Sequence, residues 1–225
     1  SNSDSIAWYY HMGFEYAGKK INILDTPGHQ DFSEDTYRTL TAADSALMLI
    51  DAAKGVEPQT IKLFEVCRLQ GIPVFTFVNK MDRFGKDPLD LMEEIEQVLG
   101  MRSCPMNWPI GMGTDFRGVF DRFKNRIQLF NQQGGSSSIP VTGSWRENSE
   151  LKSELDLGQL NQLDEDISLL DIAGDPFDLE KIYAGELTPV FFGSAVNSFG
   201  VQTFLEQYVE IAPPPQPKKK QPRNR

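Results

Sequence analysis

Short apolar runs that end at polar residues constrain the fold of this chain more than any other feature of its sequence. Three of them span residues 20–24, 45–50 and 73–78 and are followed directly by Asp25, Asp51 and Asn79. Runs of this kind are typical of parallel strands buried on both faces. Helical patterns follow two of the runs, over residues 59–70 and 88–99, and each is followed by a glycine that can end a helix. The alternation of strand and helix predicts an α/β sheet with right-handed crossovers.

Both ends of the chain add further elements. Residues 8–16 are aromatic and β-prone, and a turn at residues 17–19 predicts a hairpin with residues 20–24 at a sheet edge. Residues 188–192 predict another strand, and residues 201–211 predict a helix that stops before a proline-rich segment. The side chains expected to face inward from this helix are Phe204, Leu205, Tyr208 and Val209.

The pattern weakens in the middle of the chain. A glycine- and serine-rich loop at residues 134–138 precedes an acidic, partly helical stretch over residues 147–178. Leucines near helical spacing support a helix there, namely Leu151, Leu155, Leu157, Leu160 and Leu163. We therefore expect a small inserted α+β subdomain at residues 111–187. The main domain would comprise residues 1–110 and 188–212, and residues 213–225 would form a linker to a following domain.

Composition excludes several classes of protein. With 40% hydrophobic and 24% charged residues, the 225-residue chain has enough apolar material for a core and cannot be wholly disordered. No stretch reaches the roughly 18 apolar residues of a membrane span, so we expect no membrane partner. Cys67 and Cys104 are too few and too differently placed for a disulfide framework, which favours reduced, buried thiols in a cytoplasmic protein.

The charge distribution argues against general binding to nucleic acids. The net charge is −10, but five of the 22 basic residues lie within residues 218–225, where there are no acids. The rest of the chain therefore holds 17 basic against 32 acidic residues, a net charge of −15. Phosphate contacts need a local basic surface, so we expect no sequence-specific DNA partner. The basic tail is either a solvated linker or an RNA contact.

The segment after the first run can form a phosphate-binding turn. An aspartate that follows a buried strand, here Asp25, can hold a hydrated magnesium ion. Gly28 lets a backbone N–H come close to a phosphate oxygen. The alternative is an ordinary strand-to-helix turn in which Asp25 or Asp31 caps the helix.

The tetrapeptide Asn79-Lys80-Met81-Asp82 follows another run and can bind a purine. A carboxylate such as that of Asp82 can accept from both the ring N–H and the exocyclic amine of guanine, a donor pair that adenine lacks. The stem of Lys80 can lie flat over the base. Alone, the tetrapeptide is a weak signal, because asparagine and aspartate are common after strands.

Gly193-Ser194-Ala195 also follows an expected strand, and its small residues allow a backbone N–H to approach a ligand carbonyl. This tripeptide has almost no specificity by itself. In an open α/β sheet, however, ligands bind at the carboxyl ends of the strands. Three polar segments in this order, at one expected sheet edge, therefore indicate a guanine-nucleotide site.

Longer stretches of the sequence resemble the translational GTPases. Residues 25–38, Asp-Thr-Pro-Gly-His-Gln-Asp-Phe-Ser-Glu-Asp-Thr-Tyr-Arg, carry this resemblance. Their continuation to Leu40, with Trp-Pro-Ile-Gly at 108–111 and Thr-Pro-Val-Phe-Phe-Gly at 188–193, is similar to the bacterial peptide chain release factor 3 family. The elongation factor G family shares the first motif and Val-Asn-Lys-Met-Asp-Arg at 78–83. The resemblance covers most of the chain and implies a P-loop-NTPase-like GTPase sheet with flanking helices.

The resemblance also implies a role for each matching residue. Phosphate binding would involve Asp25, Thr26, Pro27, Gly28 and His29, and guanine binding would involve Asn79, Lys80, Asp82, Ser194 and Ala195. Asp25 would hold Mg²⁺ through water, and His29 would position the attacking water for GTP hydrolysis when ribosomal RNA orders it. Residues 31–40 would form the mobile second switch. The implied ligands are GTP or GDP with Mg²⁺, and the implied partners are the ribosome and class-I peptide release factors, which the family helps to recycle after termination.

The sequence departs from the family in one respect. It contains no phosphate-loop motif G-x-x-x-x-G-K-S/T before Asp25, and the first-switch threonine is not recognisable. We therefore expect a fragment that lacks the N-terminal phosphate loop, binds GTP poorly on its own and is inactive alone. In the family, one more strand lies between those at 20–24 and 45–50. Without it, we expect the gap to be closed by rearrangement or by a neighbouring chain, through residues 6–10.

Two other functions remain open on the sequence alone. One is an elongation-factor-G-like translocase or ribosome-protection protein. The sequence Ser-Glu-Asp-Thr-Tyr at residues 33–37 argues against it. The other is a catalytically dead module that docks on the ribosome through the acidic insert and the switch surface.

Overall fold

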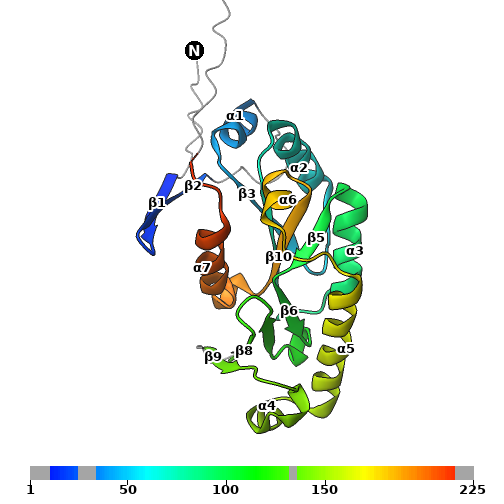
Figure 1. Cartoon of the computed structure of the whole chain (residues 1–225). Helices are drawn as coiled ribbons and strands as arrows, with labels where there is room; N and C mark the ends of the chain where they lie inside the picture. Colours follow the sequence, from blue (N-terminus) through cyan, green and yellow to red (C-terminus); the bar gives the residue numbers. More distant parts are fainter. Residues whose placement is uncertain (1–10, 25–33, 132–135, 216–225) are drawn as a thin grey trace, which may run out of the picture.

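The computed structural model describes residues 11–24, 34–131 and 136–215 (Figure 1). In these ranges the strands form a four-stranded parallel sheet, a second four-stranded sheet and a separate two-stranded hairpin. Helices lie on both faces of the parallel sheet and along the second sheet (Figure 1). Within the same ranges, no helix is long and apolar enough to cross a membrane.

The parallel sheet lies at the centre of the molecule. Its strands are, in order across the sheet, β3 (Ala46–Asp51), β4 (Val74–Asn79), β10 (Leu187–Phe192) and β5 (Arg102–Pro105). All neighbouring pairs run parallel. β4 and β10 lie in the middle and are buried along almost their whole length, as continuous apolar runs predict. The predicted α/β fold class is therefore confirmed.

Three helices cover one face of this sheet, namely α1 (Glu34–Ala42), α2 (Pro58–Gln70) and α3 (Pro88–Leu99). Both α2 and α3 have a proline in the first turn, where its missing N–H leaves no bond unmade. They end at Gly71 and Gly100, whose left-handed backbones close the last turn. These signals explain why the expected bounds of the two helices agree closely with the observed ones.

The opposite face is covered by α6 (Leu179–Tyr183) and α7 (Val201–Ile211). Aromatic rings anchor α7 to the sheet. The ring of Phe204 lies 5.0 Å from that of Phe191 and 6.0 Å from that of Phe77, and Tyr208 lies 5.1 Å from Phe75. All four side chains that we expected to face inward from this helix are buried or partly buried.

The second sheet is antiparallel and consists of β6 (Asn107–Ile110), β7 (Gly118–Asp121), β8 (Arg126–Phe130) and β9 (Ser136–Pro140). Two helices, α4 (Ser149–Glu154) and α5 (Leu157–Ala173), pack against it. Short 3-10 helices span Gly113–Asp115, Trp145–Glu147 and Ala195–Asn197. Leu151, Leu160 and Leu163 are buried, whereas Leu157 at the start of α5 is exposed. The limits of an insert at 111–187 stay a proposal, and β6 belongs to the second sheet although it precedes them.

Asn107 joins the two sheets. Its Nδ2 donates to the carbonyl of Phe192 (3.1 Å), and its Oδ1 accepts from the N–H of the same residue (2.7 Å). The N–H of Met106 also donates to the carbonyl of Val190 (2.8 Å). Asn107 is buried, so water does not compete for these bonds. They hold the second sheet against the end of β10, the strand that leads into the segment at Gly193.

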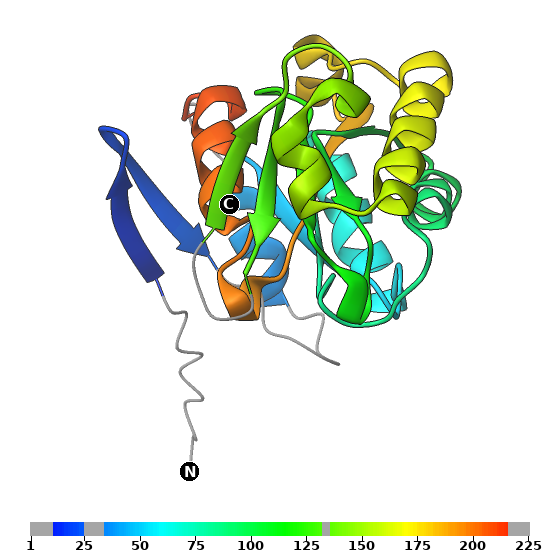
Figure 2. The ribbon, with the colours of Figure 1, turned by 90° about the horizontal axis from the view of Figure 1, so that it is seen from below.

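The N-terminal strands β1 (His11–Tyr16) and β2 (Lys19–Leu24) form the expected hairpin. Its turn residues, Ala17 and Gly18, have left-handed backbones. The expectation that residues 20–24 belong to the parallel sheet is wrong, because β2 forms a separate sheet with β1, its one partner among the described strands. The hairpin instead contacts α7, where Lys19 Nζ donates to the carbonyl of Val209 (2.9 Å). Figure 2 shows it (blue) standing to one side of the two sheets.

β3 is an edge strand within the described ranges, where β4 is its only partner. The side chains of Leu47 and Leu49 are 44% and 61% exposed. They lie on the same face of the sheet as α7, which covers this face at strands farther from the edge. Within the described ranges, the side of β3 away from β4 is thus unpaired. The expected closing rearrangement is not seen in the described residues, where the hairpin forms a separate sheet and contacts α7. Residues 6–10 lie outside those ranges, and closure by a neighbouring chain stays a prediction.

The two cysteines, Cys67 and Cys104, are free and buried. Burial raises the pKa of each thiol to about 11, and the nearby Arg122 offsets this only in part at Cys104. At pH 8, about one such thiol in a thousand is ionised. We expect the folded protein to react with DTNB more than about 100-fold slower than free cysteine does. A fast phase of the DTNB reaction in the folded protein would contradict this. The variants Cys67→Ser and Cys104→Ser would show which thiol reacts in that phase.

Candidate functional site

The carboxyl ends of β4 and β10 bring two of the predicted segments together. The strands are parallel neighbours with Val78 opposite Phe192, so Asn79 and Gly193 leave the sheet side by side. Two hydrogen bonds join the loops that follow. The N–H of Gly193 donates to the carbonyl of Val78 (3.0 Å), and the N–H of Met81 donates to the carbonyl of Gly193 (3.1 Å). Residues far apart in the sequence therefore form one surface at the edge of the sheet.

The turn at Gly193 has no room for a side chain. A Cβ atom there would lie 2.5 Å from the carbonyl oxygen of Phe199 and 2.7 Å from the ring of Phe77. Ser194 and Phe199 also donate their N–H groups to each other's carbonyls, at 3.0 and 2.9 Å. The backbone therefore folds back tightly after β10, and this close approach fixes where Ser194 and Ala195 lie.

Asn79 links the two loops through its side chain. Its Oδ1 accepts from the N–H of Lys80 (2.8 Å) and from the N–H of Ala195 (2.9 Å). The N–H of Ala195, which we expected to approach a ligand carbonyl, is thus already hydrogen-bonded, and a ligand would share or replace this bond. Among the described residues, Asn79 Nδ2 has no acceptor, so it can donate to a ligand.

Ser194 orients Asp82. The Ser194 side chain is fully buried, and its Oγ donates to Asp82 Oδ1 (2.8 Å) and accepts from Asn197 Nδ2 (2.8 Å). Ser194 thus supports the carboxylate, and no part of it is exposed to a ligand in this structure. Asp82 is partly exposed, and its Oδ2 accepts no hydrogen bond from the described residues. Sequence reasoning missed Asn197, which no local pattern distinguishes from an ordinary loop residue.

Lys80 lies between Asn79 and Asp82 in a strained backbone conformation, with φ at +68°. Its Nζ forms an ion pair with Asp51 Oδ2 at 2.9 Å. Burial raises the pKa of Asp51, but hydrogen bonds from Lys80 and from the N–H groups of Ala53 and Lys54, with the charge of Lys80, lower it below its ordinary value. Sequence reasoning did not assign Asp51 to the site. The signal was present, because Asp51 also follows an apolar run of the same sheet.

The residues expected at the phosphate end, Asp25 to His29, lie outside the described residues. In the described ranges, no group of three or more histidine, cysteine, aspartate or glutamate residues is placed to hold a metal ion. The proposed magnesium ligand Asp25 stays a proposal drawn from the sequence.

A cavity of the described structure lies away from this site. It has a volume of about 460 Å³ and is lined by residues of the second sheet, of the segment around α5 and of the end of β5, including Cys104, Arg122, Phe123, Asp171 and Phe177. Its ionic side chains already have partners, since Arg122 Nη2 lies 2.9 Å from Asp171 Oδ1 and Asp175 Oδ2 lies 2.8 Å from Arg102 Nη2. Size alone would therefore point away from the convergent polar groups at the ends of β4 and β10.

Comparisons with known proteins show the family of this chain. The family profile of the elongation factor Tu GTP binding domain matches residues 7–214. The peptide chain release factor 3 of Symbiobacterium thermophilum is 60% identical over 208 residues, which cover 92% of this chain and 39% of that protein. The corresponding protein of Gloeobacter violaceus is 57% identical over 205 residues, with 91% and 39% covered. The resemblance to release factor 3 drawn from the motifs is confirmed, and the chain spans about two fifths of the length of these relatives.

A solved structure supports the fold. A crystal structure of a protein from Thermus thermophilus superposes with a TM-score of 0.67 at 26% sequence identity, over 90% of this chain and 32% of that one. The arrangement of the parallel sheet with helices on both faces is therefore shared with that protein. Since the family profile covers nearly the whole of the described structure, the chain belongs to the elongation factor Tu GTP-binding domain family.

Proposed function

We propose that this chain is the GTP-binding core of a ribosome-dependent GTPase that promotes the recycling of class-I peptide release factors in translation termination. The observation that carries the proposal is the convergence of Asn79, Lys80 and Asp82 with Ser194 and Ala195 at one sheet edge. The similarity to release factor 3 proteins supports the choice of termination. The implied partners are the ribosome and class-I release factors, and the implied location is the cytoplasm.

At the guanine end, the contacts support a distinct role for each side chain. The carboxylate of Asp82, held by Ser194, would accept from the ring N–H and the exocyclic amine of guanine. Asn79 would donate from Nδ2, and Ala195 would offer its N–H to the guanine carbonyl. The stem of Lys80 would lie over the base. Adenine has no donor pair for Asp82, so the site would prefer guanine.

At the phosphate end, the donor types fit a magnesium nucleotide. The carboxylate of Asp25 is a hard oxygen ligand of the kind that Mg²⁺ accepts through water. When bound, the ion would neutralise charge on the phosphates. Gly28 would present its N–H to the terminal phosphate, and His29 would orient the attacking water. Thr26 and Pro27 would shape the turn between them.

The test of the guanine site is a nitrogen-15 NMR titration of this chain with millimolar GDP and ADP. GDP should shift the amides of Asn79, Asp82 and Ala195, and ADP should not. Asp82→Asn should weaken GDP binding about 10- to 100-fold, because a charged acceptor is lost from two hydrogen bonds. Asp87→Asn is the matched control, since Asp87 Oδ1 only caps α3 through the N–H of Leu89 (2.9 Å). Equal shifts with ADP would contradict the proposal.

The termination role is tested separately in the full-length protein. Ribosomes should stimulate its GTP hydrolysis and, with GTP, should speed the departure of a class-I release factor from ribosomes that have released their peptide. His29→Ala should reduce the stimulated hydrolysis strongly with little change in GDP affinity. Movement of messenger and transfer RNA instead of factor departure would favour a translocase, and an absence of GTP binding would favour a catalytically dead module.

A further inference from the structure

We propose that Asp51 is a positioning residue of the guanine site, which acts by holding the side chain of Lys80. This inference rests on the function proposed above. Asp51 is the last residue of β3 and lies opposite Asn79 in the strand register, so its carboxylate stands beside the loop that carries Lys80. Asp51 Oδ2 lies 2.9 Å from Lys80 Nζ. The pair thus connects the edge strand to the loop after β4.

The carboxylate of Asp51 is oriented independently of Lys80. Its Oδ1 accepts from the N–H of Ala53 (2.8 Å) and from the N–H of Lys54 (3.3 Å), both in the turn that follows β3. The side chain is 15% exposed, which leaves it little freedom to rotate. Oδ2 is therefore presented in one direction, toward Lys80.

Lys80 needs such a partner. Its side chain is 44% exposed, and a lysine stem has many rotamers in water. Asn79 Oδ1 holds the N–H of Lys80 in its left-handed conformation, and Asp51 holds the ammonium at the other end. The aliphatic stem between them is thus fixed before a base arrives. A side chain that is already ordered loses less freedom on binding, so affinity rises without a new contact to the ligand.

The first measurement needs no ligand. In this chain with carbon-13-labelled lysines, the side chain of Lys80 should be more ordered than that of Lys62, which forms no ion pair in the described structure. Asp51→Asn keeps the acceptor for Ala53 and Lys54 but removes the charge, and it should raise the mobility of Lys80 to that of Lys62. The matched control is Glu94→Gln, which weakens the Lys86–Glu94 pair of the same length, 2.9 Å, between the loop after β4 and α3. A mobile Lys80 in the unmodified chain would overturn the inference.

The second measurement is the affinity for guanosine 5′-monophosphate, followed by the amide shifts of residues 79–82. Asp51→Asn should weaken binding about two- to fivefold, as expected for a partly exposed ion pair. Asp51→Glu should recover part of the loss, and Glu94→Gln should have no effect. The direction of the change in affinity is decisive, because removing a negative charge would by itself strengthen the binding of a phosphate anion. Unchanged or tighter binding in Asp51→Asn would therefore overturn the inference.

Base selectivity separates the roles of Asp51 and Asp82. The preference for guanosine over inosine monophosphate depends on the exocyclic amine, which Asp82 would recognise. Asp51→Asn should leave that preference unchanged, whereas Asp82→Asn should abolish it. If the unmodified chain shows no guanine-specific shifts, the proposed guanine site fails and this inference fails with it. If the unmodified chain and Asp51→Asn bind equally, only the role of Asp51 is overturned.

Discussion

Isothermal titration of GTP into the 225-residue chain is expected to show no binding in the micromolar range. A phosphate loop supplies several N–H donors and a lysine to the phosphates of GTP, and the sequence contains no such motif. At about 1.5–3 kcal/mol for each charge-assisted bond, the absence of roughly three or four of them costs on the order of 5–10 kcal/mol. A micromolar dissociation constant corresponds to about 8 kcal/mol, so the guanine end cannot hold GTP tightly by itself.

A comparison of GTP with guanosine 5′-monophosphate sharpens this prediction. If the chain contacts mainly the base, the two nucleotides should bind with similar, millimolar affinities. GTP that binds more than about tenfold tighter would mean that the phosphates find donors within this chain. A micromolar dissociation constant for GTP would contradict the prediction outright. A cooperative thermal unfolding transition, measured on the same sample, is the control that the chain is folded.

The sequence allowed the centre of the fold to be predicted because its signals there are local. The apolar runs that became β4 and β10 are buried on both faces, and only strands inside a parallel sheet need such runs. The ends of α2 and α3 are marked by proline and glycine, whose backbone preferences do not depend on the rest of the chain. The place of β2 could not be predicted in this way. Its pairing with β1 was predicted from the turn, but local signals do not show that the hairpin stands apart from the parallel sheet and contacts α7.

The site was predicted to a similar degree. Residue types and order suggested that Asn79 and Asp82 would meet Ser194 and Ala195, and the structure places them together through the parallel pairing of β4 with β10. The role of each side chain within the site was not predictable. Ser194 orients Asp82 through a hydrogen bond between residues that are 112 positions apart in the sequence. Local periodicity carries no information about such pairs. The same holds for the pair of Asp51 with Lys80.

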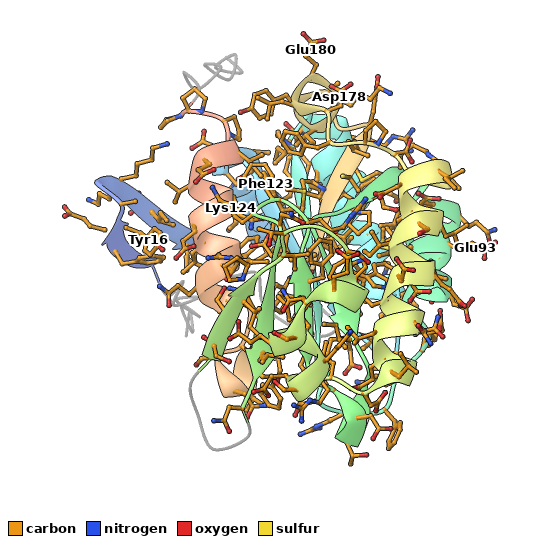
Figure 3. The ribbon with its side chains drawn as sticks, turned by 60° about the horizontal axis from the view of Figure 1, so that its bottom comes forward. Tyr16, Glu93, Phe123, Lys124, Asp178 and Glu180 are labelled. Carbon is orange, nitrogen blue, oxygen red and sulfur yellow. The ribbon has the colours of Figure 1, made fainter. Side chains whose placement is uncertain are left out.

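Asp121 should be the polar residue whose loss destabilises the fold most. It is the last residue of β7, and its side chain is fully buried. Arg126 Nε lies 3.2 Å from Oδ2, and Gln207 Nε2 donates to both carboxylate oxygens at 3.1 Å. The N–H groups of Phe123 and Lys124 donate to Oδ1 at 3.1 and 3.0 Å. Figure 3 shows Phe123 and Lys124 on this turn, beside α7.

Asp121→Ala is therefore expected to lower the free energy of unfolding by about 3–5 kcal/mol, as measured by urea denaturation. The variant leaves Arg126, Gln207 and two backbone N–H groups without their shared acceptor; of these groups Gln207 is buried and the others are partly buried. Asp121→Asn keeps one acceptor oxygen and should lower the free energy of unfolding by less than Asp121→Ala does. The matched control is Asp171→Ala, because Asp171 pairs with Arg122 at 2.9 Å but is 63% exposed. That change should cost at most about 1 kcal/mol.

The size of the effect also measures how firmly the second sheet is joined to α7. Asp121 and Arg126 belong to β7 and β8, whereas Gln207 belongs to α7, so the carboxylate connects two elements that are distant in the sequence. A double-mutant cycle of Asp121→Ala with Gln207→Ala should give a coupling energy of about 1 kcal/mol or more. Two results would contradict this: a loss of less than about 1 kcal/mol of unfolding free energy in Asp121→Ala, or additive effects of the two changes. Either result would mean that apolar contacts, and not the carboxylate, hold the second sheet and α7 together.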